Sequence, residues 1–231
     1  MNALIRLDAN SLTGSGHFFR SLEIAKILIK KKIKVFFITR YIDDFYIKLL
    51  RKEKILHILI PLGESRLKNQ YDKFFEKEEI SKVNRLVKNF FFKIIIIDHY
   101  SIASEWEKKI KNKSDKIMVL DDLNKNKHIC DFYVNPNLII TKDSIKNKMI
   151  NNKTHIFLGI KYLFVNEKFS KLKKIKKNKF SIFIYFGNVD SNNVLKKLLK
   201  IISGKEFNIY KKIVIFPTNK FNKSDILKIQ K

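Results

Sequence analysis

The segment ALIRLDANSLTGSGHFFRSLEIAKIL, residues 3–28, sets the fold class of this chain. Its first five residues are apolar except for Arg6 and predict a buried β-strand, and the part from Phe18 onward has the apolar spacing of a helix that packs on a sheet. The residues expected on that packed face are Leu22, Ala25, Leu28 and Ile29. A polar loop with two glycines joins strand and helix. This order is typical of a βα unit in a parallel sheet.

The same alternation continues along the chain and predicts an α/β fold of the doubly wound type. Strands are expected at 3–7, 34–38, 55–59, 93–97 and 116–120, with helices at 18–31, 43–52, 73–89 and 102–112. These form an N-terminal Rossmann-like domain, residues 1–165. A lysine-rich segment at 166–179 is expected to be a solvated connector. Strands at 180–186 and 212–216 and a helix at 194–202 then predict a second Rossmann-like domain, residues 166–231, which is incomplete.

The charge of the chain is strongly positive, but its distribution argues against nucleic acid as a partner. There are 49 Lys and Arg against 22 Asp and Glu, a net charge of +27, yet only six of the basic residues are Arg and the lysines are scattered over every predicted element. Nucleic-acid sites favour Arg clustered on one face. We therefore expect no nucleic-acid partner, whereas an anionic ligand in one cleft would still benefit from the positive field.

Cysteine and hydropathy patterns predict a cytoplasmic protein with no membrane partner. The single cysteine, Cys130, excludes an internal disulfide and is expected to be a small buried residue in a reducing compartment. Arg6 and Asp8 interrupt what would be the apolar part of an export signal. The most apolar run, 90–97, contains Lys93 and is too short to cross a bilayer.

Polar side chains follow several of the predicted strands, which is where ligands bind in parallel α/β sheets. Asp98, His99 and Tyr100 follow the strand at 93–97, and Asp121 and Asp122 follow the strand at 116–120. Further along, Asn135 and Asn137 flank Pro136. Two alternatives stay open for the acidic residues. Asp98 could cap the next helix, as could Ser101 or Ser104, and Asp121 with Asp122 could be an acid/base pair or a metal site. Because no cluster of His or Cys supports a metal, we expect none.

The loop GSGHFFR, residues 14–20, is the strongest candidate for chemistry. Gly14 and Gly16 would allow positive φ and a close approach of the backbone to an anion at the helix start. Position 19 is Phe, so the dinucleotide-binding fingerprint fails. The positive end of the helix dipole would keep His17 neutral, and a neutral histidine can act as a general base. The alternative is a turn with a packed histidine. The other histidines, His57, His128 and His155, have no partner pattern and are expected to be packed or on the surface.

Taken together the motifs resemble the PseG/SpsG-type UDP-sugar hydrolases of pseudaminic acid synthesis, which have the two-domain GT-B fold. The matching segments lie between Met1 and Asn193, and they are RLDANSLTGSGHFFRSLEIA, IIDHYSIASEWE, IMVLDDLNKNKHICDFYVNPN, FLGIKYLFVNEKF and FGNVDSNN. The resemblance implies hydrolysis of UDP-2,4-diacetamido-2,4,6-trideoxy-β-L-altropyranose at the anomeric carbon, with inversion, with His17 as general base and without metal or cofactor. UDP and the free diacetamido sugar would be the products.

The resemblance also suggests contact residues and a limit to the chain. Candidate substrate contacts are Arg6, Asp8, Gly14, Gly16, Arg20, Asp98, His99, Tyr100, Asp122, Asn137 and Tyr162, and candidate UDP contacts are Gly187, Asn188 and Asp190. The chain is expected to end before further βα units of the family and to be a monomer. Other hypotheses are a non-catalytic remnant of the family, or a glycosyltransferase or epimerase of the same fold.

Overall fold

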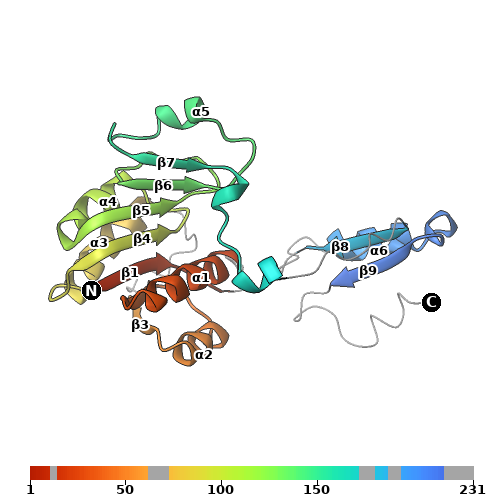
Figure 1. The fold of residues 1–231 in the computed structure, drawn as a ribbon, viewed down its shortest axis with the longest axis horizontal. Coiled ribbons are helices and arrows are strands. Elements are labelled where there is room, and N and C mark those ends of the chain that lie inside the picture. Colours follow the sequence, from red (N-terminus) through yellow and green to blue (C-terminus); the bar gives the residue numbers. More distant parts are fainter. Residues whose placement is uncertain (11–14, 62–72, 172–179, 187–193, 216–231) are drawn as a thin grey trace. The chain divides into compact units, whose positions relative to one another are not determined.

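The computed structural model describes residues 1–10, 15–61, 73–171, 180–186 and 194–215. The chain divides into two compact units (Figure 1). The first comprises Met1–Asn10 and Gly16–Glu167, and the second comprises Ser11–Ser15 and Lys168–Lys231. Within the described ranges, no helix has the length and hydropathy needed to cross a bilayer.

The first unit is built on a seven-stranded sheet in which all neighbouring strands are parallel. The strands are β1 (Asn2–Leu7), β2 (Lys34–Thr39), β3 (Leu56–Leu59), β4 (Phe92–Asp98), β5 (Ser114–Leu120), β6 (Phe132–Asn135) and β7 (His155–Leu158). Their order in the sheet is β3-β2-β1-β4-β5-β6-β7. The winding direction reverses between β1 and β4, where Leu7 pairs with Asp98. Such a switch point leaves a crevice at the carboxyl ends of the two strands.

Helices cover both faces of this sheet (Figure 1). The helices of the first unit are α1 (Gly16–Lys30), α2 (Asp44–Lys52), α3 (Lys73–Leu86), α4 (Ser104–Ile110) and α5 (Lys142–Lys146). Alternate residues of each central strand enter opposite cores: Leu4 packs with α3 and α4, whereas Ile5 packs with α1 and α2. Because both faces are buried, the central strands are almost continuously apolar. The expected doubly wound α/β fold is confirmed.

The second unit contains β8 (Ser181–Tyr185), α6 (Val194–Ile202) and β9 (Lys211–Ile215) in its described part. The two strands pair in parallel, and α6 buries Leu195 and Leu199 against Ile184. Elsewhere in the chain, short 3-10 helices lie in the first unit at Lys111–Lys113 and Ile160–Tyr162, at the unit boundary at Glu167–Lys171, and in the second unit at Lys205–Phe207. The helix and the two strands agree with the βα pattern expected after residue 179.

The structure corrects three local expectations. Strands β6 and β7 were not expected; each has four residues, and unlike the equally short β3 neither lies in a longer apolar stretch such as 55–60. On α1, Ile29 is 38% exposed, and Phe18 and Ser21 are buried in addition to Leu22 and Ala25. Neither serine caps α4. Its first turn is closed by Glu76 of α3, whose Oε1 accepts hydrogen bonds from the amides of Ala103 and Trp106 at 2.9 and 3.1 Å.

Candidate active site

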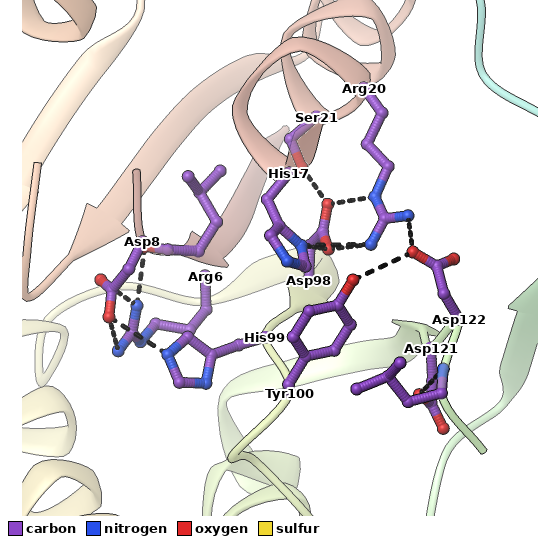
Figure 2. A network of polar contacts seen from close by, with 12 residues as sticks. Arg6, Asp8, His17, Arg20, Ser21, Asp98, His99, Tyr100, Asp121 and Asp122 are labelled. Atoms are coloured by element: carbon purple, nitrogen blue, oxygen red, sulfur yellow. Dashed lines mark hydrogen bonds and ion pairs between the residues drawn. The ribbon is translucent and has the colours of Figure 1, made fainter. Parts of the chain in front are cut away.

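The start of α1 places three polar side chains over the carboxyl end of β4. His17, Arg20 and Ser21 are spaced i, i+3 and i+4, which puts them on one helix face. All three contact Asp98, which is completely buried at the end of β4 (Figure 2). Sequence reasoning found His17 and Arg20 but missed Ser21, although the helical spacing from His17 was the signal that could have found it.

Asp98 acts as an ionised acceptor for this helix face. It accepts hydrogen bonds from Arg20 Nε at 2.7 Å and Ser21 Oγ at 3.1 Å, and its Oδ1 is in short contact with His17 Nδ1. Burial raises the pKa of Asp98, but the hydrogen bonds from Arg20, the contact with His17 and the charge of Arg20 outweigh burial and lower this pKa to about 2. Because Asp98 can only accept, we assign the proton of the contact to His17 Nδ1.

This assignment leaves Nε2 of His17 as the basic atom of the ring. His17 is 8% exposed, and the part of the chain that the structure describes offers Nε2 no hydrogen-bond partner. Arg20 Nη2 lies 3.1 Å from Nδ1, but it also donates to Asp98. The ring of Tyr100 packs edge-on against the imidazole, with 4.4 Å between centroids. A histidine held by a carboxylate with its second nitrogen open has the geometry of a general base.

Arg20 joins this pair to the end of β5. Its Nη1 donates to Asp122 Oδ2 at 2.5 Å, and the same oxygen accepts from the Tyr100 hydroxyl at 3.3 Å. Burial and the neighbouring charge of Asp122 raise the pKa of Tyr100 to about 12, so this phenol is a hydrogen-bond donor at neutral pH. His17, Arg20, Asp98, Tyr100 and Asp122, all named as candidates from sequence, therefore form one network between the start of α1 and the ends of β4 and β5.

Arg6, Asp8 and His99 form a second network beside the first (Figure 2). The completely buried guanidinium of Arg6 donates to Glu79 at 2.7 Å twice, to Asp8 at 2.7 and 3.2 Å, and to the Leu7 carbonyl at 2.7 Å. These bonds use all five of its N–H groups. Arg6 thus has no donor left for a ligand in this structure, and Glu79 of α3 is a partner that no sequence spacing indicated.

The carboxylate of Asp8 is also bound by several donors of the protein. It accepts from Arg6, from the amides of Arg40 and Tyr41 at 2.7 and 3.1 Å, and from His99 Nε2 at 3.1 Å. Since the Ser101 amide donates to the other nitrogen of His99, the proton of His99 lies on Nε2. Burial raises the pKa of Asp8, but Arg6 and His99 lower it well below its usual range. This second network therefore holds the ends of β1, β2 and β4 together.

The two adjacent acidic residues after β5 point to different partners, so they are not an acid/base pair. Asp122 joins Arg20, whereas Asp121 accepts from the amides of Leu123 and Asn124 at 2.9 and 3.1 Å and from the Tyr133 hydroxyl. Among the described residues, no group of three or more His, Cys, Asp or Glu side chains is arranged to hold a metal ion.

Other predicted positions are more scattered. A small pocket beside Arg20 is lined by Tyr162 and by apolar residues that include Leu120 and Phe164. Asn137 is exposed in the loop after β6 and accepts from the Ile139 amide at 3.1 Å. Gly16 is the first residue of α1 and lacks the positive φ that was expected. Four predicted contacts lie outside the described residues, namely Gly14, Gly187, Asn188 and Asp190.

Fold and site together define an α/β protein of the GT-B type with a histidine and carboxylate pair at its switch point. The structure matches the crystal structure of MurG from Acinetobacter baumannii with a TM-score of 0.56, covering 99% of this chain and 69% of MurG. At 11% identity this likeness concerns the fold alone. No model of a known protein family matches the sequence.

Sequence similarity to two curated proteins indicates the family. The chain is 30% identical over 197 residues to the UDP-2,4-diacetamido-2,4,6-trideoxy-beta-L-altropyranose hydrolase of Campylobacter jejuni. The matched region covers 84% of this chain and 63% of that protein. It is also 28% identical, over its whole length, to an uncharacterized protein of Methanocaldococcus jannaschii, of which it covers 48%. The chain thus spans about half to two thirds of these relatives. The Campylobacter match supports a PseG-like family, as the sequence motifs indicated.

Proposed function

We propose that this chain acts on a UDP-sugar and hydrolyses the anomeric bond of UDP-2,4-diacetamido-2,4,6-trideoxy-β-L-altropyranose, with His17 as general base. One observation carries the proposal: Asp98 binds Nδ1 of His17 and leaves Nε2 without a described partner at the switch point of the sheet. The sequence similarity to the Campylobacter hydrolase supports the substrate class.

The proposed reaction is an in-line displacement by water. Nε2 of His17 takes a proton from the water while its oxygen forms a bond to C1 of the sugar. The bond from C1 to the diphosphate oxygen breaks, and its electron pair leaves with UDP, so that the configuration at C1 is inverted. Asp98 stabilises the imidazolium that forms, and the proton later passes to solvent. No cofactor enters this scheme.

The remaining side chains of the network would bind and orient the substrate. Arg20 presents N–H groups next to the base, and the Tyr100 hydroxyl, which donates its proton to Asp122, presents an acceptor oxygen. The amides at the start of α1 suit a diphosphate. In this proposal residues 1–165 supply the base and the sugar contacts, and residues 166–231 supply the nucleotide side through Gly187, Asn188 and Asp190. The protein would act as a monomer.

The test is UDP release by the purified chain, the His17→Ala variant and a matched histidine control. His155, at the start of β7, is exposed and stacks on Phe132, away from the network, so His155→Ala serves as the control. We expect His17→Ala to lower kcat by about 10²- to 10⁴-fold, the usual contribution of a general base, with His155→Ala close to wild type. Equal UDP release by His17→Ala and wild type would refute the proposal.

Product analysis separates hydrolysis from the other hypotheses. In water without an acceptor, NMR should show UDP and the free diacetamido sugar in equal amounts. A UDP-linked isomer would indicate an epimerase, and release only with an added acceptor would indicate a glycosyltransferase. Calorimetry with UDP tests the hypothesis of a non-catalytic remnant. A working nucleotide site is expected to bind UDP with a submillimolar Kd, and absence of such binding would favour the non-catalytic remnant.

A further inference from the structure

A second buried histidine lies outside the proposed catalytic machinery. His128 is 2% exposed, and each of its ring nitrogens faces a carboxylate. Nδ1 lies 2.6 Å from Glu107 Oε1, and Nε2 lies 3.4 Å from Asp121 Oδ2. Glu107 is completely buried and Asp121 is 7% exposed. His128 is thus packed, one of the two placements expected from sequence, but its carboxylate partners were not predicted.

This environment favours the doubly protonated ring. Nδ1 makes a hydrogen bond with Glu107, whereas Nε2 makes no hydrogen bond with the described residues and faces Asp121 at ion-pair distance. Two carboxylates beside one ring favour its positive charge. Burial lowers the pKa of His128, but its contacts with Asp121 and Glu107 outweigh burial and raise this pKa to about 9. The titratable groups around it are Glu107 from α4, Asp121 at the end of β5, the Tyr133 ring from β6 with 5.7 Å between centroids, and Cys130 two residues along the chain. The last two stay neutral, because burial raises the pKa of the Tyr133 phenol and of the Cys130 thiol.

The two carboxylates that face His128 lie close in sequence to residues of the active-site network. Glu107 lies on α4, the helix that follows the loop with Tyr100. Asp121 directly precedes Asp122, the carboxylate that binds both Arg20 and Tyr100. Both carboxylates also order local backbone, since Glu107 accepts from the Ile129 amide and Asp121 accepts from two amides of its own turn.

Further contacts join the same two stretches of the chain. The side-chain amide of Asn126 donates to the Tyr100 carbonyl at 2.9 Å, and the Ser104 amide donates to the Lys127 carbonyl at 2.9 Å. Both are neutral contacts with a main-chain acceptor. Within the described residues, one ion pair joins α4 to the segment 121–128, that of His128 with Glu107, and His128 also pairs with Asp121 at the start of its own segment. The charge on this ring therefore links α4 to the start of the segment 121–128.

We propose that His128 is a positioning residue whose imidazolium clamps Glu107 to Asp121 and thereby sets where Asp122 and Tyr100 stand relative to Arg20 and His17. This inference rests on the proposed function for its kinetic consequence, and on geometry alone for its structural one. A shift of the β5 loop would move Asp122 away from Arg20 and loosen the carboxylate that holds His17. Displacements of about 1 Å can cost about 10²-fold in rate.

The kinetic test uses Glu107→Gln and His128→Gln, with His155→Gln as the matched control. Glu107→Gln keeps the shape of the side chain but removes its charge. We expect both to lower kcat about 10- to 100-fold with KM changed less than about threefold, because ligand contacts stay while alignment is lost. The wild type should lose activity above about pH 9, and this alkaline limb should move to lower pH in Glu107→Gln and vanish in His128→Gln. Unchanged kcat and an unchanged alkaline limb in both variants would overturn the proposal.

A second readout does not depend on catalysis, so failure of this inference and failure of the proposed function remain distinguishable. NMR of the full chain labelled with ¹⁵N-histidine follows His17 and His128 separately. In the wild type we expect His128 to titrate near pH 9, and we expect Glu107→Gln to lower that midpoint and to change the His17 signals. A His128 midpoint near 6.5, or His17 signals identical in wild type and Glu107→Gln, would overturn the inference even if the protein hydrolyses nothing. The wild-type titration decides the matter if His128→Gln does not fold.

Discussion

Replacing Glu79 by Gln tests the buried ion pair that holds the carboxyl end of β1. Glu79 and Arg6 are both completely buried, and the two oxygens of Glu79 each accept one hydrogen bond of 2.7 Å from the guanidinium. Gln keeps the shape but removes the charge and turns one acceptor into an N–H₂ that faces the N–H groups of Arg6. The guanidinium then keeps only Asp8 as a counter-charge.

The magnitude follows from these two bonds. Hydrogen bonds to charged groups contribute about 1.5–3 kcal/mol each, and breaking one side of a buried ion pair costs about 3–5 kcal/mol. We therefore expect Glu79→Gln to lower the free energy of unfolding by about 4 kcal/mol. With a slope of about 2 kcal/mol per molar urea, the unfolding midpoint falls by about 2 M.

The assay has a built-in reporter and a matched control. Trp106, the single tryptophan, is completely buried on α4 in the first unit, so its fluorescence follows urea unfolding of that unit. Glu78 is the preceding residue on α3, but it pairs with Lys82 at partly exposed positions. We expect Glu78→Gln to cost less than about 0.5 kcal/mol. A difference between Glu79→Gln and Glu78→Gln of less than about 1 kcal/mol would refute the reasoning.

Three further predictions concern pH, thiol reactivity and the start of α1. Because the pKa of His128 is raised from 6.5 to about 9, its protonation stabilises the fold fully below pH 6.5, and this contribution is lost as pH rises through about 9. The free energy of unfolding in urea should therefore be lower at pH 9.5 than at pH 6.5 by on the order of 3 kcal/mol in the wild type and by much less in Glu107→Gln. Cys130 is buried with a raised thiol pKa, so it should react with a thiol reagent only on unfolding, and rapid native labelling would contradict its placement. A Cβ at Gly16 would meet nothing within 4 Å, so Gly16→Ala should fold normally while KM for the UDP-sugar rises about tenfold, whereas an unchanged KM would argue against a close approach of substrate at this helix start.

The parts of the fold that sequence predicts are those with long and regular patterns. Strand β1, helix α1 and strand β4 were placed to within two residues, because their apolar runs are continuous and separated by polar loops. Strands β6 and β7 were missed although β3, also of four residues, was predicted, because β3 lies in a longer apolar stretch, 55–60, interrupted only by His57. The packed face predicted for α1 included Ile29, which is exposed, and omitted Ser21, which is buried. Ser21 is polar and donates a hydrogen bond to Asp98, so a search for apolar spacing does not find it.

The candidate site was predictable in composition but not in pairing. Residues at strand ends converge in any parallel sheet, so His17, Arg20, Asp98 and Tyr100 could be named from their positions. The partner of a buried charge depends on which helix covers it, and Glu79 is 73 residues from Arg6. Likewise Glu107 lies 21 residues from His128, with no spacing rule to connect them.

The strand order also has a consequence for how the chain is made. β1 is synthesised first, but its neighbour β4 begins only at Phe92, so one edge of β1 stays unpaired until then. His17 is synthesised 81 residues before its partner Asp98, and Arg20 is synthesised 102 residues before its partner Asp122. An apolar strand with an open edge is prone to association with other chains. A nascent or shortened chain that stops before β4 therefore carries the histidine without its carboxylate and exposes the edge of β1 that β4 would otherwise cover.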